Sequence, residues 1–368
     1  MKQILFAVKN MNIGGVEKSL LSLLNTIDRS EYAVDLLLLE DYGGFMDAIP
    51  DWVNVIICKD YASIKDEVNL PPLQVIKAHL QNGRIGRAAK LAIAYAQTKL
   101  AKDYSFYYKA VFSTVGRLPK HYDAAISYTS IISYLTWFVD YHVDADMYIG
   151  WIHFEIDKFG YDRCFLLKLH QKMKKIFVVS PSSLEIFVKI FPELKDKCEV
   201  RYNVVDKKEI IRLSEQEVEN IQHQDIFTII TTGRLTVQKN QIIIPQIIRV
   251  LNEKGYKVHW YLIGEGGERT VIEEESRKYS VNEYLHFLGR TTNPYPYLRQ
   301  ADIYVQPSIY EGYCIALAEA RVFGLPCVAT NFSGSHEQLD GKENCYVVPM
   351  RVDAIADAIM KVINKISV

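Results

Sequence analysis

The chain has 368 residues, of which 49% are hydrophobic and 24% charged, and its formal net charge is −1. This composition excludes an intrinsically disordered chain and one embedded in a membrane. The length exceeds what a single hydrophobic core usually serves, so we expect two domains, although length alone also allows one large barrel.

Short apolar runs alternate with longer helical patterns along the chain, which predicts parallel sheets with helices on their faces. The first half is expected to hold strands at residues 4–8, 34–39, 55–58, 124–128, 147–152 and 176–179, with a helix that begins at Gly15. The second half is expected to hold strands at residues 227–232, 259–263, 284–288, 303–306 and 327–329, and a last helix at 352–366.

Residues 206–224, rich in Lys, Glu and Gln, are expected to connect the two series rather than to join a core. We therefore predict an α/β protein of two Rossmann-like, doubly wound domains, residues 1–205 and 206–368, that face each other across a cleft. In open α/β sheets ligands bind beyond the carboxyl ends of the strands, so we expect the chemistry there.

A basic segment at residues 71–120 is hidden by the near-neutral total charge. Asp103 is the only acidic residue of this segment. Its basic residues are Lys77, Arg84, Arg87, Lys90, Lys99, Lys102, Lys109, Arg117 and Lys120. Apolar residues recur there at helical spacing. The segment predicts contact with an anionic partner, a lipid surface or a polyphosphate; a solvated helical face is the alternative interpretation.

The six cysteines are scattered, without a CxxC pair or a metal-ligand spacing, as is typical of a reducing cytoplasm. The apolar run after Gln3 is too short for a signal peptide. The longest apolar stretch, residues 131–139, falls short of the roughly 20 residues that span a bilayer. We expect a cytoplasmic location, with any membrane association peripheral on the inner face of the cell membrane.

The segment that follows the expected strand at 303–306 is the most informative one. Glu311 would lie on the loop at the carboxyl end of the strand, and Glu319 on a helix that begins near Cys314 or Ile315. The unpaired amides that open this helix favour an anion such as a diphosphate. Taken singly, each acid is an ordinary loop or helix-surface acid.

A second segment follows the strand at 227–232 and carries Arg234 and Lys239 on a turn before a helix. An arginine fork and a compact lysine charge can converge on one diphosphate. Basic residues on exposed loops are mostly solvated, so this segment indicates a diphosphate site only in combination with Glu311 and Glu319.

Together these motifs resemble the retaining glycosyltransferases of the GT-B fold, of the glycosyltransferase family four (group 1) type. The resemblance rests on Gly233-Arg234-Leu235 with Lys239-Asn240, Leu262-Ile263-Gly264-Glu265-Gly266, Phe287-Leu288-Gly289, and Glu311 with Glu319. In the first half it is looser and rests on Gly14-Gly15, Trp151-Ile152-His153 and Tyr202-Asn203-Val204-Val205-Asp206.

The resemblance implies transfer of a hexose from a UDP-sugar or GDP-sugar to a saccharide or lipid-linked saccharide, in cell-surface polysaccharide biosynthesis, without a metal ion or a nucleic-acid partner. Its implied catalytic residues are His153, Arg234, Lys239 and Glu311. Its implied donor-binding residues are Gly14, Gly15, Gly233, Arg234, Lys239, Gly264, Leu288, Arg290, Glu311, Gly312, Tyr313, Cys314, Ile315 and Glu319.

Each role in this set is specific. Arg234 and Lys239 would bind the diphosphate, and Glu311 the hydroxyls of the transferred sugar. The other implied contacts are Glu319 with the ribose, the backbone around Leu288 and Arg290 with the base, Gly14 and Gly15 with the diphosphate and acceptor, and His153 with the reacting carbon. Alternatively, His153 is a core histidine and Gly14-Gly15 a tight turn.

Two departures from the family pattern stand out. The residues after Glu311 are Gly-Tyr-Cys-Ile, where many relatives have a second small residue, so the donor-sugar pocket is expected to differ. The chain stops at Val368, where relatives often continue into a helix that crosses back to the first domain. Either that crossover is shorter here or the sequence is truncated.

Other functions remain open at this point. A nucleotide-sugar epimerase or a phosphorylase uses two such domains, and an inactive partner subunit would keep the fold and only bind donor. A nicotinamide-dependent oxidoreductase is disfavoured because no GxGxxG follows the first strand. Asp144-Ala145-Asp146 resembles a metal-binding DxD motif but precedes an expected strand, which disfavours a metal role.

Overall fold

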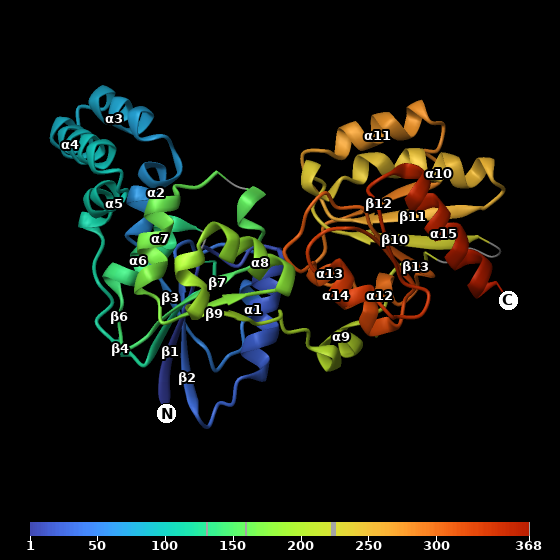
Figure 1. Cartoon of the computed structure of the whole chain (residues 1–368), viewed down its shortest axis with the longest axis horizontal. Coiled ribbons are helices and arrows are strands. Elements are labelled where there is room, and N and C mark those ends of the chain that lie inside the picture. The colour runs from blue at the N-terminus through green and yellow to red at the C-terminus, as the bar shows by residue number, and fades with distance from the viewer. Residues whose placement is uncertain (130–131, 159, 222–225, 368) are drawn as a thin grey trace. The chain divides into compact units, whose positions relative to one another are not determined.

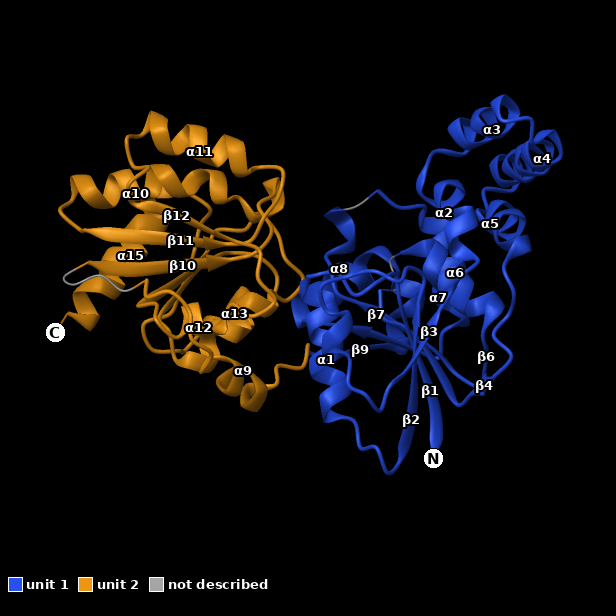
Figure 2. Cartoon of the chain, turned by 180° about the vertical axis from the view of Figure 1, so that it is seen from behind, with its two compact units in different colours: residues 1–202 blue, residues 203–368 orange. Residues whose placement is uncertain are grey.

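The computed structural model describes residues 1–129, 132–158, 160–221 and 226–367. The chain divides into two compact units, Met1–Tyr202 and Asn203–Val368, close to the expected boundary at 205/206 (Figures 1 and 2). Each unit is built around its own parallel sheet, with helices over its faces. The expected α/β class is confirmed.

Unit 1 holds a seven-stranded sheet of order β3-β2-β1-β5-β7-β8-β9. Its strands are β1 (Lys2–Val8), β2 (Tyr32–Leu38), β3 (Asn54–Ile57), β5 (Ala124–Ser127), β7 (Tyr148–Ile152), β8 (Lys175–Val178) and β9 (Cys198–Val200). A separate two-stranded ladder pairs β4 (His121–Tyr122) with β6 (Asp144–Ala145). The helices are α1 (Gly15–Thr26), α2 (Tyr61–Asn69), α3 (Pro72–Gln81), α4 (Ile85–Ala101), α5 (Ser105–Val111), α6 (Ser133–His142), α7 (Arg163–Lys172) and α8 (Pro181–Ile190).

Unit 2 holds a six-stranded sheet of order β12-β11-β10-β13-β14-β15. Its strands are β10 (Phe227–Thr232), β11 (Val258–Ile263), β12 (Leu285–Gly289), β13 (Ile303–Gln306), β14 (Cys327–Thr330) and β15 (Tyr346–Val348). The helices are α9 (Lys207–Leu213), α10 (Ile244–Glu253), α11 (Arg269–Lys278), α12 (Tyr295–Leu298), α13 (Ile315–Ala320), α14 (Ser335–Leu339) and α15 (Val352–Ile366).

In both units the strand order reverses beside the first strand. β1 lies between β2 and β5, and β10 lies between β11 and β13, all in parallel register. At such a reversal the connecting helices leave on opposite faces of the sheet, which opens a crevice at the carboxyl ends of the strands. In unit 2 this is where the loops after β10 and β13 meet.

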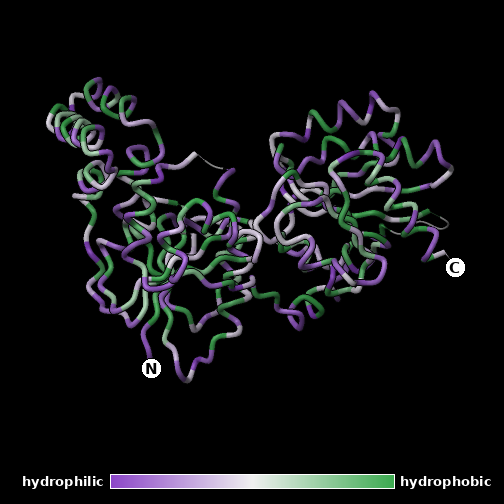
Figure 3. Tube along the Cα trace, in the orientation of Figure 1, coloured by the Kyte–Doolittle hydropathy of each residue, from purple (hydrophilic) through white to green (hydrophobic). Residues whose placement is uncertain are grey.

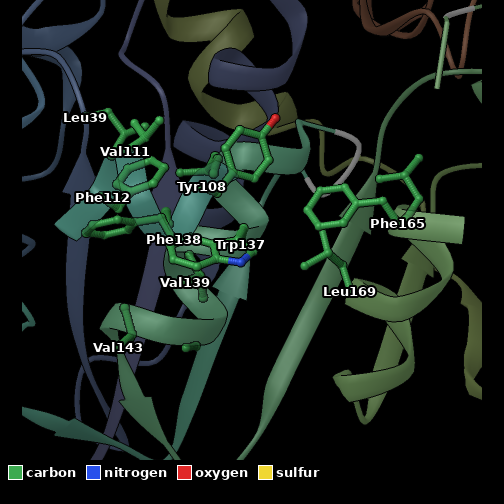
Figure 4. Close-up of a cluster of buried hydrophobic side chains, with 14 of the residues drawn as sticks. Leu39, Tyr108, Val111, Phe112, Trp137, Phe138, Val139, Val143, Phe165 and Leu169 are labelled. Atoms are coloured by element: carbon green, nitrogen blue, oxygen red, sulfur yellow. The ribbon is translucent and has the colours of Figure 1, made fainter. Parts of the chain in front are cut away.

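Side chains alternate between the two faces of a sheet along each strand, so a buried strand contributes to the hydrophobic core on both faces. Along β10, Ile229 belongs to the hydrophobic cluster on one face of the sheet and Ile230 to the cluster on the other. Because both faces are covered, the strands read as continuous apolar runs (Figure 3). In unit 1 a cluster of buried aromatic side chains, with Phe112 and Trp137 stacked at 5.4 Å, packs α5 and α6 together (Figure 4).

Every expected strand is present, and α1 and α15 begin at the expected residues. The strands β4, β6, β9 and β15 were not expected, because each has only two or three residues and carries little apolar signal. The expectation for residues 206–224 was wrong in part. Asp206 caps α9 by accepting a hydrogen bond from the amide of Glu209 at 3.1 Å, and Ile210 and Ile221 are buried in the core of unit 2. Residues 222–224 lie outside the described residues, as does Ile131 at the start of the expected apolar stretch.

No helix in the described ranges combines the length and the apolar character that crossing a bilayer requires.

Candidate donor-binding site

Three glycines bring the loops after β10, β11 and β12 into main-chain contact. The amide of Gly264 donates to the carbonyl of Gly289 at 2.7 Å, and the amide of Gly233 donates to the carbonyl of Ile263 at 2.9 Å. Gly264 has φ +144°, and a Cβ there would lie 2.0 Å from the carbonyl oxygen of Gly233. Glycine at 264 is therefore required by both conformation and space.

Lys239 crosses this surface to reach the next loop. Its side chain passes over Gly233, where an added Cβ would lie 3.3 Å from Lys239 Cε. Lys239 Nζ then lies 2.5 Å from Glu311 Oε1. The two loops are also joined through the main chain, since the amide of Ile309 donates to the carbonyl of Gln238 at 2.8 Å.

A relay of buried side chains holds Glu311 in place. Ser308 Oγ donates to Glu311 Oε1 at 2.7 Å, and Gln306 Nε2 donates to Ser308 Oγ at 2.8 Å. Tyr304 OH in turn donates to Gln306 Oε1 at 2.6 Å. Because every member is buried and hydrogen-bonded, the carboxylate has one fixed position at the carboxyl end of β13.

The ion pair keeps Lys239 charged. Burial lowers the pKa of the Lys239 ammonium, but the negative charge of Glu311 more than offsets this effect, and the pKa lies above its ordinary value. Only 15% of the Lys239 side chain and 8% of the Glu311 side chain are exposed. A fixed cation at low solvent exposure interacts strongly with an incoming anion.

Glu319 lies on α13, as expected, but it is not a surface acid. It is buried, and its Oε1 accepts a hydrogen bond from Tyr295 OH at 2.8 Å. Burial, together with the charge of Glu319, raises the pKa of the Tyr295 hydroxyl, so this group stays a donor. The interpretation of Glu319 as an ordinary helix-surface residue is thereby excluded.

Cys314 is the last residue of the loop between Glu311 and α13. It has φ +61° and precedes the first helical residue, Ile315. Burial, with the charge of Glu311, raises the pKa of the Cys314 thiol to about 12, whereas the charge of Lys239 lowers it. Glu319 raises this pKa too, so all three charged residues act electrostatically on one buried thiol. Gln338 Nε2 donates to the carbonyl of Tyr313, and Gly312 is buried.

Arg234 and Arg290 are exposed at the same edge of the sheet, directly after β10 and β12. In the described part of the chain, neither guanidinium has an ion-pair partner. Leu288 is half-buried at the end of β12. The structure therefore brings Lys239 and Glu311 into contact, buries Glu319 beside the same loop, and leaves two guanidinium groups open to solvent.

The expected residues of unit 1 lie at the carboxyl ends of its own strands. His153 follows β7 and is buried, with its ring 4.5 Å from that of Tyr128 and 5.8 Å from that of Trp151. Gly14 caps α1 with an extended backbone, φ −158°, and Gly15 is the first residue of that helix. A Cβ at Gly14 would meet only the flexible carboxylate of Glu17, at 2.4 Å.

The Asp144-Ala145-Asp146 motif belongs to the small ladder of β4 and β6. His121 Nδ1 lies 2.9 Å from Asp144 Oδ2, and His121 Nε2 lies 3.3 Å from Asp146 Oδ1. Hydrogen bonding to Asp144 raises the pKa of His121. Both carboxylates thus pair with one surface histidine.

Sequence reasoning missed the supporting residues Gln306, Ser308 and Tyr295. The first two had a signal, since both are polar residues that follow an apolar strand at the edge where ligands bind. Tyr295 had none, because its contact with Glu319 joins residues 24 positions apart.

Known proteins share both the second half of the sequence and the whole fold. Residues 214–366 match the family model described as "Glycosyl transferases group 1". An N-acetylgalactosaminyltransferase of Campylobacter jejuni is 27% identical over 175 residues, which are 48% of this chain and 46% of that protein. An uncharacterized glycosyltransferase of Methanocaldococcus jannaschii is 26% identical over 159 residues, which are 42% of this chain and 39% of that protein. The chain thus spans less than half the length of these curated relatives.

Solved structures match over the full length. HepE of Anabaena, in complex with UDP and glucose, has a TM-score of 0.68 at 16% identity and covers 100% of this chain and 91% of its own. TarM of S. aureus, as a mutant in complex with Fondaparinux, alpha-GlcNAc-glycerol and UDP, has a TM-score of 0.68 at 14% identity and covers 99% of this chain and 93% of its own. The chain has the GT-B fold, and its residues 214–366 match the family of group 1 glycosyl transferases.

Proposed function

We propose that the chain transfers a hexose from a nucleotide diphosphate sugar to a saccharide or lipid-linked saccharide, with retention of the anomeric configuration. The observation that carries this proposal is the buried ion pair of Lys239 and Glu311 beside the buried carboxylate of Glu319. A cation and two acids at the carboxyl edge of one parallel sheet fit a ligand that combines a diphosphate with hydroxyl groups.

In this proposal the basic residues stabilise the leaving group. As the bond from the anomeric carbon to the diphosphate breaks, its electron pair passes to the phosphate oxygen, where negative charge builds up. Lys239, which its ion pair with Glu311 holds in the charged form, and the exposed Arg234 stabilise that charge without a metal ion. The acceptor hydroxyl attacks from the face that the diphosphate leaves, and its proton passes to the departing phosphate.

The acids bind the hydroxyl groups. Glu311 accepts hydrogen bonds from the transferred sugar while it holds Lys239, and Glu319 accepts them from the ribose. The main chain of Gly233, Gly264 and Gly289, with Leu288 and Arg290, contacts the base. In unit 1, we propose that His153 lies near the reacting carbon and that Gly14 and Gly15 lie near the diphosphate and the acceptor.

The printed names of similar proteins guide the choice of ligands. HepE is described in complex with UDP-glucose, so UDP-sugars are to be tested first and GDP-sugars second. The Campylobacter relative is named as acting on a diphospho-undecaprenol acceptor, and AmsD of Erwinia amylovora, 28% identical over 120 residues, is named for amylovoran biosynthesis. We therefore propose a role in polysaccharide biosynthesis, in the cytoplasm.

A donor screen with product analysis tests the proposal. The full chain is mixed with UDP-sugars and GDP-sugars in a thermal-shift assay, where a ligand at a hundred times its Kd stabilises by roughly 2.7 kcal/mol. The stabilising donor is then incubated with and without saccharide acceptors, and NMR assigns the anomer of the product. We expect transfer with retention. Conversion of the donor without an acceptor would identify an epimerase, and binding without any conversion would identify an inactive partner subunit.

A further inference from the structure

The helical hairpin of α3 and α4 has an apolar surface that faces away from the core of unit 1. In Figures 1 and 2 the two helices lie beyond α2 and α5, apart from the sheet. Among the residues that the structure describes, all exposed leucines lie between positions 70 and 100. They are Leu70, Leu73, Leu80 and Leu100. Figure 3 shows hydrophobic residues along both helices.

The exposed residues of α4 form a stripe. At about 100° per residue, Ile85, Ala89, Ile93, Ala96 and Leu100 fall within an arc of about 80°. Ile85 is 68% exposed, Ile93 62% and Leu100 88%. The buried face, with Leu91 and Ala94, lies on the opposite side of the helix. Packing inside unit 1 therefore accounts for one apolar face of α4 and leaves the second one open.

Basic residues border this stripe. Residues 71–102 contain no acidic residue, and their basic residues are Lys77, Arg84, Arg87, Lys90, Lys99 and Lys102. Lys77 lies between Leu73 and Leu80 on the exposed face of α3. An aliphatic stripe with lysine and arginine at its borders is the pattern of a helix that lies in a membrane interface.

Two of these cations hold the hairpin in place instead. Arg87 Nε donates to Glu67 Oε1 at 2.9 Å, and Arg87 Nη1 donates to the carbonyl of Ala110 at 2.9 Å. Lys90 Nζ donates to Ser113 Oγ at 2.6 Å. Arg87 and Lys90 thus join α4 to α2 and to the end of α5, and the exposed Lys77, Arg84, Lys99 and Lys102 remain for a partner.

We propose that the exposed face of α3 and α4 docks on a bilayer surface that contains anionic lipids. The aliphatic side chains enter the boundary between head groups and acyl chains, while Lys77, Arg84 and Lys99 contact the lipid phosphates. A second copy of this chain fits less well, because a symmetric contact would bring like charges together. A nucleic acid fits less well because the stripe offers aliphatic rather than aromatic side chains for base stacking.

Vesicle flotation of the full chain tests this docking. Wild-type protein is mixed with vesicles of phosphatidylcholine alone and of phosphatidylcholine with phosphatidylglycerol, at low and high salt. We expect binding only to the anionic vesicles, and weaker binding at high salt because salt screens the attraction. No binding to either vesicle, or equal binding to both, would overturn the proposal.

Two triple variants, each with a matched control in unit 2, assign the surface. Lys77→Glu, Arg84→Glu and Lys99→Glu together should weaken binding at least about a hundredfold, whereas Lys254→Glu, Arg277→Glu and Lys361→Glu should not. Ile85→Gln, Ile93→Gln and Leu100→Gln together should weaken it at least about tenfold, whereas Ile211→Gln, Val271→Gln and Met350→Gln should not. All substituted residues are exposed, and circular dichroism checks that the variants fold.

Two results would contradict the assignment. The hairpin variants could bind vesicles as the wild type does, or the wild type could form dimers that the glutamine variant abolishes, which would assign the surface to a second copy. The assay contains no sugar donor, so its failure would leave the proposed glycosyl transfer untouched.

Discussion

Lys239 Nζ lies 2.5 Å from Glu311 Oε1, and this ion pair joins the loop after β10 to the loop after β13. Because both side chains are largely buried, the pair fixes a positive and a negative charge at one point of the sheet edge. Breaking such a pair by removing one partner is costly, since the remaining charge is left buried and uncompensated. In the proposed mechanism, stability and catalysis therefore depend on the same two residues, and experiments must separate them.

Lys239→Met tests the catalytic role, since methionine keeps much of the packing over Gly233 and removes the charge. We expect donor turnover to fall by a factor of about 10² to 10³, because one preorganised cation at the leaving group is lost. The melting temperature should fall as well, because Glu311 loses its partner. The exposed Lys254→Met is the control, and unchanged turnover in Lys239→Met would refute the role.

The double variant Lys239→Met with Glu311→Gln separates stability from activity. Removing both charges should restore much of the melting temperature, as is typical when a buried pair is replaced as a whole. Turnover should stay low. Recovery of turnover together with stability would show that the ion pair has only a structural role.

Glu319 and Tyr295 are expected to affect donor affinity. Glu319→Gln replaces a charged hydrogen-bond acceptor with a neutral one. We expect the Kd for UDP, measured by calorimetry, to rise about tenfold or more. Tyr295→Phe removes only the hydroxyl that positions Glu319, so we expect a smaller rise, about threefold to tenfold. A Kd for UDP that is unchanged in both variants would contradict the proposed ribose contact.

Gly264→Ala should destabilise unit 2, because the new Cβ would lie 2.0 Å from a carbonyl oxygen in a conformation that suits glycine. We expect a loss of at least about 3 kcal/mol of unfolding free energy. Gly267→Ala is the matched control, since a Cβ there meets nothing within 4 Å. Urea unfolding compares the two variants, and equal stability would argue against the close contact of the two loops.

Asp140 on α6 gives unit 1 a pH dependence. Both carboxyl oxygens are buried without a hydrogen-bond partner among the described residues. Burial raises the pKa of this carboxyl from 3.8 to about 7, although the charge of Lys172 acts in the opposite direction. Since the folded state binds the proton more tightly, the resulting stabilisation is complete below pH 3.8 and is lost as pH rises through 7.

At pH 8 the buried carboxylate therefore costs up to about 4 kcal/mol. We expect Asp140→Asn to raise the unfolding free energy at pH 8 by about 2–4 kcal/mol, and by less at pH 5. The exposed Asp357→Asn should change neither value. A gain from Asp140→Asn that is the same at both pH values would contradict this explanation.

Chelation tests the metal-free mechanism. If Arg234 and Lys239 supply the positive charge, an excess of EDTA should leave turnover of the donor unchanged. Loss of turnover that added Mg²⁺ or Mn²⁺ restores would show that a cation takes part in the stabilisation of the diphosphate.

The fold was largely predictable because its strands are buried on both faces. A buried parallel strand such as β10 is a continuous apolar run, and its ends are marked by polar or glycine residues. The edge strands β9 and β15 have three residues each and gave no such signal. The helix α9 was interpreted as a linker because its single buried residue, Ile210, stands among charged ones.

The charged residues of the site were predictable, and their partners were not. Arg234, Lys239 and Glu311 follow expected strands at the edge where ligands bind, and Glu319 lies on the expected helix after one of them. Their burial depends on packing, however, and the contact of Tyr295 with Glu319 joins two helices. For the same reason the sequence could not tell Arg87, which is bonded to Glu67, from the exposed cations of the hairpin such as Lys77 and Arg84.

The contact between Gly264 and the carbonyl of Gly233 also constrains how this protein can diverge. That part of the proposed donor surface is main chain on main chain, so side-chain exchange cannot reshape it without disrupting the loops. In the proposed donor site, a change of donor preference in the course of evolution, or by engineering, is therefore restricted to the bordering side chains, such as Leu288 and Arg290, which flank Gly289.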